Sequence, residues 1–235
     1  MSTRPGARQF PLPFDHRSSL GGEDFLLAPC NREAVAWIDR WPDWPGPALV
    51  IVGARAAGKT HLASVLAARS GGQAITVTDL IEIPPAELAA IGTLILDDAE
   101  GVVGSADAEQ GLFHLLNHLA ASPMEGGRGR LLMTAIEPPA RWGVGLRDLA
   151  SRLNAAPVAT IGAPDDPLIG ALLVKLFADR QVRLSAEVIP YLVARMERSF
   201  DAARALVAAL DARALAEGRA VSIALARAVM GEDQD

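Results

Sequence analysis

The stretch GARAAGKT, residues 53–60 of this 235-residue chain, carries residue types and spacing that could do chemistry. It matches the pattern G-x-x-x-x-G-K-[ST], in which backbone N–H groups and the positive end of a following helix cradle phosphates. We therefore predict that the backbone of Gly53, Ala57 and Gly58 surrounds phosphate, that Lys59 reaches the β- and γ-phosphates, and that the Thr60 hydroxyl coordinates Mg²⁺. A glycine-rich turn that matches by accident is the alternative. The flanks disfavour it, because the apolar run ALVIVG precedes the motif and the helical pattern KTHLASVLAARS begins within it.

Polar side chains also follow two other apolar runs. In LILDD, Asp97 and Asp98 come after three apolar residues, and in RLLMT the run ends at Thr134. Ligands bind at the carboxyl ends of the strands in parallel sheets. Asp97 is therefore predicted to hold Mg²⁺, directly or through water, and Asp98 to orient or activate the attacking water. Thr134 either touches the γ-phosphate or that water, or it caps the next turn.

The elements that must position these residues are visible as five β-rich runs at residues 48–53, 74–78, 93–98, 130–135 and 158–163. The runs are continuously apolar, which is typical of strands covered on both faces of a parallel sheet. Helical patterns lie between them and predict a doubly wound α/β core. After residue 163 only helical patterns remain, beginning near residues 166, 185, 199 and 222, so we expect a small all-helical lobe.

Composition limits the function classes. The net charge is −6, and lysine occurs only at Lys59 and Lys175, so a basic stripe for duplex DNA is not evident and direct DNA binding is disfavoured. Cys30 is the only cysteine, which excludes an intramolecular disulfide and fits a reducing cytoplasm. No apolar run reaches the roughly 18 residues of a membrane span, and the first residues lack the apolar core of a secretory signal. We therefore predict a cytoplasmic protein with no membrane partner.

The ordered set of motifs resembles the DnaA-type AAA+ family. The resemblance rests on EDFLLAPCNREAVAWI, GKTHL, LILDDAEGVVG, GLFHLLN, LLMTAIEPPARW, LRDLASRL and RALVAALD, which span almost the whole chain. It implies an α/β fold with a P-loop AAA+ five-stranded parallel sheet flanked by helices, followed by a small all-helical lid. The implied domains are a tail at residues 1–22, a nucleotide-binding domain at 23–163 and a lid at 164–235.

The resemblance also implies roles for individual residues. Arg152 in ASRL would be an arginine finger that acts in trans on the nucleotide of a neighbouring molecule, and Arg204 in AARALVAAL would be the sensor II arginine of the lid. Asn31 and Arg32 would lie near adenine and ribose, and His61 in GKTHL extends the nucleotide-binding set. A forked, permanently charged guanidinium suits phosphate oxygens. On local pattern alone, Arg152 would be assigned to a surface salt bridge and Arg204 to a solvated helix face.

The Hda-type regulators of this family are a DnaA-like core without the DNA-binding domain, and this chain resembles them because it stops just after the lid. Those regulators use the DNA-loaded sliding clamp and stimulate hydrolysis of DnaA-bound ATP. Their tails carry a short clamp-binding peptide, which QFPLPF at residues 9–14 resembles, with Phe10 and Pro11 departing from its usual form. The implied clamp contacts are Gln9, Phe10, Leu12 and Phe14. Folding of these residues onto the protein's own surface is the alternative.

The implied partners are DnaA, the β sliding clamp of DNA polymerase III, and a second copy in a homodimer or weak homo-oligomer. The implied ligands are ADP or ATP with Mg²⁺. Ala135 and Ile136 replace polar residues that DnaA tends to carry after the threonine, which favours weak intrinsic ATPase activity and an ADP-bound working form. Two other functions remain open: a stand-alone helicase-loader-like ATPase, and a non-enzymatic adaptor whose nucleotide is only structural.

Overall fold

Five parallel strands form the centre of the nucleotide-binding part of the computed structural model, which describes residues 27–121, 129–182, 184–185 and 187–231. The strands are β1 (Ala48–Gly53), β2 (Gln73–Ile75), β3 (Thr93–Leu96), β4 (Arg130–Ala135) and β5 (Val158–Ile161). Their order in the sheet is β2-β3-β4-β1-β5. The predicted five-stranded parallel sheet is therefore confirmed, and β4 lies between the strand that precedes the phosphate loop and the strand that precedes Asp97.

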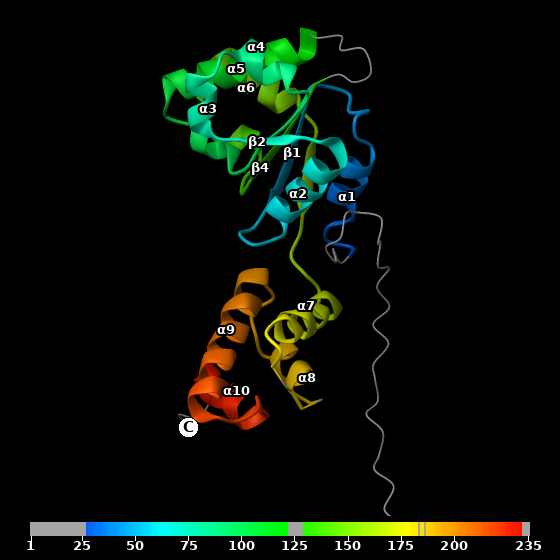
Figure 1. Ribbon diagram of the computed structural model, residues 1–235, viewed down its shortest axis with the longest axis vertical. Coiled ribbons are helices and arrows are strands. Elements are labelled where there is room, and N and C mark those ends of the chain that lie inside the picture. The colour runs from blue at the N-terminus through cyan, green and yellow to red at the C-terminus, as the bar shows by residue number, and fades with distance from the viewer. Residues whose placement is uncertain (1–26, 122–128, 183, 186, 232–235) are drawn as a thin grey trace, which may run out of the picture.

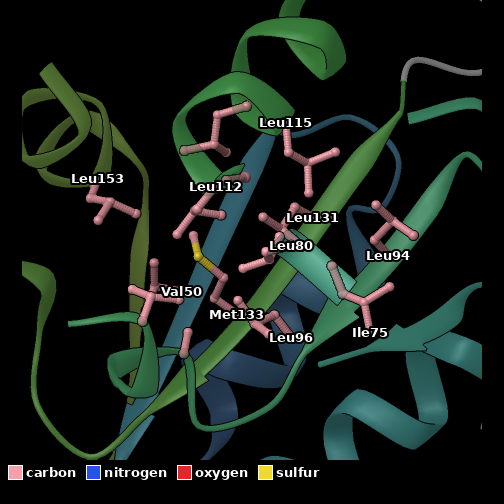
Figure 2. Packing of buried hydrophobic residues seen from close by; sticks show 14 of the residues in the cluster. Val50, Ile75, Leu80, Leu94, Leu96, Leu112, Leu115, Leu131, Met133 and Leu153 are labelled. Carbon is pink, nitrogen blue, oxygen red and sulfur yellow. The ribbon is translucent and has the colours of Figure 1, made fainter. Parts of the chain in front are cut away.

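Successive residues of β1 point to opposite faces of the sheet, and both faces are covered (Figure 1). Leu49 and Ile51 pack with α1 (Arg32–Asp39) and α2 (Lys59–Ser70). On the other face lie α3 (Val77–Glu82), α4 (Pro85–Ala90), α5 (Ala106–Ala121) and α6 (Arg147–Ala155). Figure 2 shows Leu112 and Leu115 of α5 over Val50 and Met133 of the sheet. Burial on both faces explains why the strands are continuously apolar.

The predicted end of the second strand is wrong. Residues 74–78 were expected to be extended, but β2 ends at Ile75 and α3 begins at Val77. The reason is a capping box, in which the Thr76 side chain accepts from the Asp79 N–H and the Asp79 carboxylate accepts from the Thr76 N–H. The runs at 93–98 and 158–163 also form shorter strands, which end at Leu96 and Ile161.

The predicted helical lobe is confirmed as a bundle with its own core. It comprises α7 (Asp166–Asp179), α8 (Val188–Val193), α9 (Phe200–Glu217) and α10 (Ile223–Met230). Helix α9 starts at the Ser199 cap and ends at Gly218, as its sequence predicts. The α7 cap is Asp165, one residue earlier than expected, because its carboxylate accepts from the Leu168 N–H at 2.9 Å. Figure 1 shows this lobe as a body beyond one end of the sheet.

The connections on the α3–α6 side include two short 3-10 helices, η1 (Ala99–Val102) after β3 and η2 (Pro139–Arg141) after β4. They follow the two strands that carry Asp97 and Thr134, so they form part of the rim around the carboxyl edge of the sheet. Among the helices in the described ranges, none is both long and apolar enough to cross a membrane.

Candidate nucleotide site

The phosphate loop connects β1 to α2 at the carboxyl edge of the sheet. Gly58 has a φ of 95°, in the left-handed region that glycine adopts without strain. A Cβ on Gly53 would lie 3.0 Å from the Ile161 carbonyl oxygen, so the start of the loop also needs glycine to sit against β5. The Lys59 Nζ is 2.9 Å from the carbonyl oxygens of both Gly53 and Ala54, and the residue is 6% exposed. The loop thus holds a buried ammonium where a phosphate would be a charge-assisted partner.

The predicted magnesium ligands meet beside this loop. The Thr60 hydroxyl donates to one Asp97 carboxylate oxygen at 2.8 Å, and the Thr134 hydroxyl donates to the other. The Thr134 oxygen in turn accepts from the Asp98 N–H at 3.0 Å. The strand order explains this meeting, because β4 carries Thr134 between β1 and β3. A hydroxyl and a carboxylate are hard oxygen ligands, so Thr60 and Asp97 fit Mg²⁺, which usually takes few protein ligands and completes its shell with phosphate and water.

No group of three or more His, Cys, Asp or Glu side chains suited to a metal occurs within the residues that the structure describes. A magnesium ion at Thr60 and Asp97 would therefore depend on oxygens from a nucleotide. This is the arrangement expected of a nucleotide-dependent metal rather than of a resident structural metal.

A cavity of about 800 Å³ opens beside the loop. The α/β part contributes the loop itself together with Asp98, Glu100 and Ile136, and the lid contributes Asp201 and Arg204. Asp98 and Arg204 therefore lie where the sequence placed them. Asp97, which is exposed, and Thr134, which is buried, are hydrogen-bonded to each other and are not among the residues that line the cavity. The Thr134 hydroxyl bonds to Asp97 and to the Asp98 N–H, both of which follow β3 rather than β4, and its contact with a γ-phosphate or attacking water stays a prediction.

A second cavity of about 230 Å³ continues from the first, sharing with it Ala56, Ala57, Gly58, His61 and Arg204. Its other lining residues are Asn31 and, from the lid, Leu168, Leu172, Lys175, Leu176, Asp179 and Phe200. It is smaller and richer in apolar side chains than the first. Together the cavities offer a polar chamber, with Lys59 and Arg204 available to phosphates, next to a more apolar one for a base, which is the division a nucleotide requires.

The residues predicted to contact the rest of the nucleotide, Asn31, Arg32 and His61, do not all line the cavities. Asn31 is 4% exposed, lines the smaller cavity and accepts from the Ala28 N–H at 2.9 Å. His61 lines both cavities. Arg32 is exposed on α1 and lines neither cavity. The structure thus brings Asn31 and His61 to the site and leaves Arg32 outside its walls.

Sequence reasoning missed Phe200, Lys175 and Glu100. Phe200 begins α9 one helical turn before Arg204, so the periodicity of that helix could have placed both on one face. Glu100 follows the two aspartates within η1, and its Oε1 accepts from the Ile136 N–H at 2.9 Å. Its Oε2 is buried and has no hydrogen-bond partner in the described part of the chain. Only the turn of η1 brings this side chain to the cavity, and no pattern in the sequence signals that turn.

Arg152 lies at the other edge of the sheet. It is exposed on α6, its guanidinium carbon is 5.8 Å from the centre of the Phe113 ring, and it lines a separate cavity with Ala48 and Ala156. Ala48 begins β1, whereas the phosphate loop follows the end of β1. A six-residue strand is about 17 Å long. Arg152 is therefore remote from this chain's own phosphate loop, and any phosphate it contacts must belong to another molecule.

The parallel sheet of order β2-β3-β4-β1-β5, the phosphate loop after β1 and the helical lobe together form an AAA+ fold. Its fold is that of domain III of the replication initiation protein DnaA. The crystal structure of that domain from Thermotoga maritima superposes with a TM-score of 0.73 at 18% identity, covering 88% of this chain and 94% of that one. No protein-family model matches the chain.

The curated proteins that are similar in sequence include a DnaA and an uncharacterized protein. The chromosomal replication initiator protein DnaA of Sphingopyxis alaskensis is 33% identical over 150 residues, which cover 63% of this chain and 32% of DnaA. An uncharacterized protein of Haemophilus influenzae is 27% identical over 240 residues, covering 95% of this chain and 98% of that protein. This chain therefore spans about a third of the DnaA it matches and almost all of the Haemophilus protein.

Two of the structural neighbours carry nucleotides. AMPPCP-bound DnaA from Aquifex aeolicus has a TM-score of 0.62 at 18% identity, covering 78% of this chain and 62% of that one. The FIGL-1 AAA domain in complex with ADP has a TM-score of 0.60 at 11% identity, covering 86% and 79%. Their ligands are consistent with a nucleotide in the two joined cavities. The predicted clamp contacts Gln9, Phe10, Leu12 and Phe14 lie outside the described residues.

Proposed function

We propose that this chain is an AAA+ regulator of DNA replication initiation that docks on the DNA polymerase III sliding clamp and stimulates hydrolysis of DnaA-bound ATP. The observation that carries the proposal is the separation of two functions across one sheet. A phosphate site of its own lies at the carboxyl edge, and Arg152 is exposed at the amino edge. Similarity to DnaA over 150 residues supports a role in initiation.

Binding of ADP or ATP is the first part of the proposal. Lys59 and Arg204 supply positive charge from the two sides of the larger cavity, and Thr60 and Asp97 take Mg²⁺ with the phosphates. Because Arg204 belongs to the lid, a bound nucleotide would join the lid to the α/β part. The resident nucleotide then organises the protein's surface, whether or not it is hydrolysed.

Action of Arg152 on a partner's ATP is the second part. An arginine supplied in trans can accelerate hydrolysis by roughly three to five orders of magnitude in nucleotide hydrolases, because its charge stabilises the transition state. Exposure of Arg152 leaves its guanidinium accessible to a second molecule. The second molecule proposed is DnaA carrying ATP, although a second copy of this chain would present the same chemistry.

The experiment is single-turnover hydrolysis of DnaA-bound ATP with clamp-loaded DNA, with and without this protein. We expect stimulation by the wild type and its loss in Arg152→Ala. Arg147→Ala is the matched control, since Arg147 is an exposed arginine on the same helix, five residues earlier. The proposal fails if the wild type does not stimulate, or if Arg152→Ala stimulates fully.

Docking on the clamp is the third part, and it rests on the peptide QFPLPF. Its two prolines limit the conformations of the free peptide and so reduce the entropy lost on binding, while Leu12 and Phe14 offer apolar anchors and Gln9 an amide. The test is a pull-down with purified clamp. Changing Gln9, Leu12 and Phe14 to alanine should abolish capture, whereas changing Arg4 and Arg8, which precede the peptide, should not.

Weak intrinsic turnover is the expectation for this chain's own nucleotide. In the cavity wall, Ile136 is 38% exposed, and the nearby Thr134 hydroxyl is already bonded to Asp97. Ile136 has no polar side-chain atom with which to orient water. A stand-alone ATPase would instead show robust turnover that is abolished in Asp98→Asn, so steady-state hydrolysis by the purified protein separates these functions.

A further inference from the structure

A buried carboxylate outside the nucleotide site ties α5 to α6. Glu109 of α5 is 5% exposed. Its Oε2 accepts from the Leu146 N–H at 2.8 Å and its Oε1 from the Gly145 N–H at 3.2 Å. Burial alone would raise the pKa of this carboxyl, but N–H groups of Leu146, Gly145 and Gly104 hold the pKa below its ordinary value. These N–H groups thus stabilise the ionised form of the carboxyl group.

The N–H groups of Gly145 and Leu146 lie directly before helix α6, so the Glu109 carboxylate acts on the start of that helix. Helix α6 begins at Arg147, and its N-cap residue is Leu146, whose side chain makes no capping hydrogen bond. The first N–H groups of a helix have no partner within the helix and need an acceptor from elsewhere. Glu109, which belongs to a different helix, accepts from the N–H of the N-cap residue Leu146 and from the N–H of Gly145 before it, and its negative charge also favours the N-terminal end of the α6 dipole. It therefore fixes where α6 starts relative to α5.

Helix α5 also touches the functional end of α6. Phe113 lies one turn after Glu109, and its ring faces the guanidinium of Arg152, with the guanidinium carbon 5.8 Å from the ring centre. Leu149, between these two contacts, and Leu153, directly after Arg152, are buried in the core. The helix is thus held at its start by Glu109, along its length by apolar packing, and at Arg152 by Phe113.

We propose that Glu109 is a positioning residue for Arg152: by capping α6 from α5, it sets the place and direction in which the guanidinium meets a partner's phosphate. The inference rests on the proposed function of Arg152. A displacement of about 1 Å in a reacting geometry can cost about 100-fold in rate, so a small shift of the helix that carries Arg152 is enough to matter. Glu109 acts on the rate through Arg152 and touches no nucleotide.

Glu109→Gln is the informative variant, because it keeps the size of the side chain but turns one acceptor into a donor facing an N–H. We expect stimulated hydrolysis of DnaA-bound ATP at saturating protein to fall at least about tenfold, the half-saturating concentration to change less than about twofold, and this chain's own ADP affinity to be unchanged. Asp148→Asn is the control, since it removes an exposed carboxylate from the first turn of α6 that makes none of these bonds.

A double-mutant cycle with Arg152→Lys separates positioning from a general structural role. If Glu109 works through Arg152, Glu109→Gln should have a much smaller effect when Arg152 is already lysine. An equal fold-loss in both backgrounds would overturn the proposal. Equal damage by Asp148→Asn would also overturn it, since charge near the helix end would then be sufficient.

Hydrogen exchange tests the placement independently of DnaA. Glu109→Gln should speed amide exchange at residues 145–153 by at least about tenfold, while the phosphate loop exchanges as in the wild type. If the wild-type protein does not stimulate DnaA at all, the proposed function fails, and this result still shows whether Glu109 fixes α6. Unchanged exchange at residues 145–153, or faster exchange without any loss of stimulation, would refute the positioning role.

Discussion

Replacing Thr134 with valine tests the hydrogen bonds that join β4 to the residues after β3 at the nucleotide site. Thr134 is fully buried, and valine has nearly the same shape, so packing of β4 is preserved. Two interactions are lost: the hydroxyl no longer donates to the Asp97 carboxylate, and it no longer accepts from the Asp98 N–H. The substitution therefore isolates the polar contribution of one oxygen atom.

The magnitude follows from the surroundings of each partner. The Asp98 N–H is part-buried, and leaving such a donor without an acceptor costs about 1–3 kcal/mol. Asp97 is exposed and keeps its bond from Thr60, so water can replace most of what Thr134 gave it. We therefore expect the free energy of unfolding to fall by about 2 kcal/mol.

Urea unfolding measures this loss, with Thr160→Val as the control. Thr160 is an exposed strand residue of β5, and its change should stay within about 0.5 kcal/mol. For Thr134→Val, the midpoint should fall while the slope with urea is unchanged. Titration with ADP should then show a loss of affinity of about tenfold in Mg²⁺ and little change in EDTA, because a misoriented Asp97 affects the metal rather than the phosphates.

Two results would refute the reasoning. A stability loss no larger than that of Thr160→Val would mean that the Thr134 oxygen does not join the strands. Unchanged ADP affinity together with a selective loss of ATP affinity would place the Thr134 hydroxyl at the γ-phosphate, which is the alternative drawn from the sequence.

Three further predictions concern the loop, a helix contact and pH. Lys59→Met should weaken ADP binding by about 10- to 100-fold in calorimetry, because a charged donor beside the phosphates is lost; affinity equal to the wild type would contradict the assigned phosphate site. Gly111→Ala should destabilise the protein by about 1–3 kcal/mol or more in thermal unfolding, since a Cβ there would lie 2.0 Å from the Leu80 carbonyl oxygen. Gly170→Ala, whose Cβ meets nothing closer than 3.8 Å, should be neutral or stabilising. The hydrogen bond from Arg198 lowers the pKa of Asp166 below its ordinary 3.8. That pair stabilises the fold fully above about pH 3.8, and its contribution is lost as pH falls through the lower folded pKa, so Asp166→Asn should flatten the acid limb of a stability–pH curve and change little above it.

The sheet was predictable because burial on both faces leaves an unmistakable pattern. Runs such as ALVIVG contain no polar position, because a strand covered on both sides favours apolar residues. The same pattern could not fix the ends of strands. Residues 74–78 are apolar or β-branched, yet the helix begins at Val77, because a capping box at Thr76 and Asp79 satisfies its first N–H groups. Local hydrogen bonding outweighs strand propensity there.

The meeting of Lys59, Thr60 and Asp97 was predictable from one rule, that the carboxyl ends of parallel strands share an edge. The contact between Thr134 and Asp97 could not be predicted from this rule alone. It depends on the position of β4 between β1 and β3, and the spacing of apolar residues does not give the order of strands in a sheet. The lid residues of the smaller cavity are harder still. Phe200 and Lys175 lie on helices whose packing against the α/β part depends on the whole lobe.

Glu109 shows where sequence reasoning ends for this chain. In the sequence it is one acidic residue in a helical run, with the appearance of a solvated position. In the fold it is buried, because the loop before α6 folds over α5 and presents N–H groups that only an acceptor can satisfy. The phosphate loop follows the end of β1, whereas Arg152 lies in the last turn of α6, shortly before β5 begins at the amino edge. Glu109 holds the start of α6, toward the carboxyl edge, and Phe113 contacts Arg152 near the end of that helix, so contacts with α5 hold the helix that carries Arg152 at both of its ends.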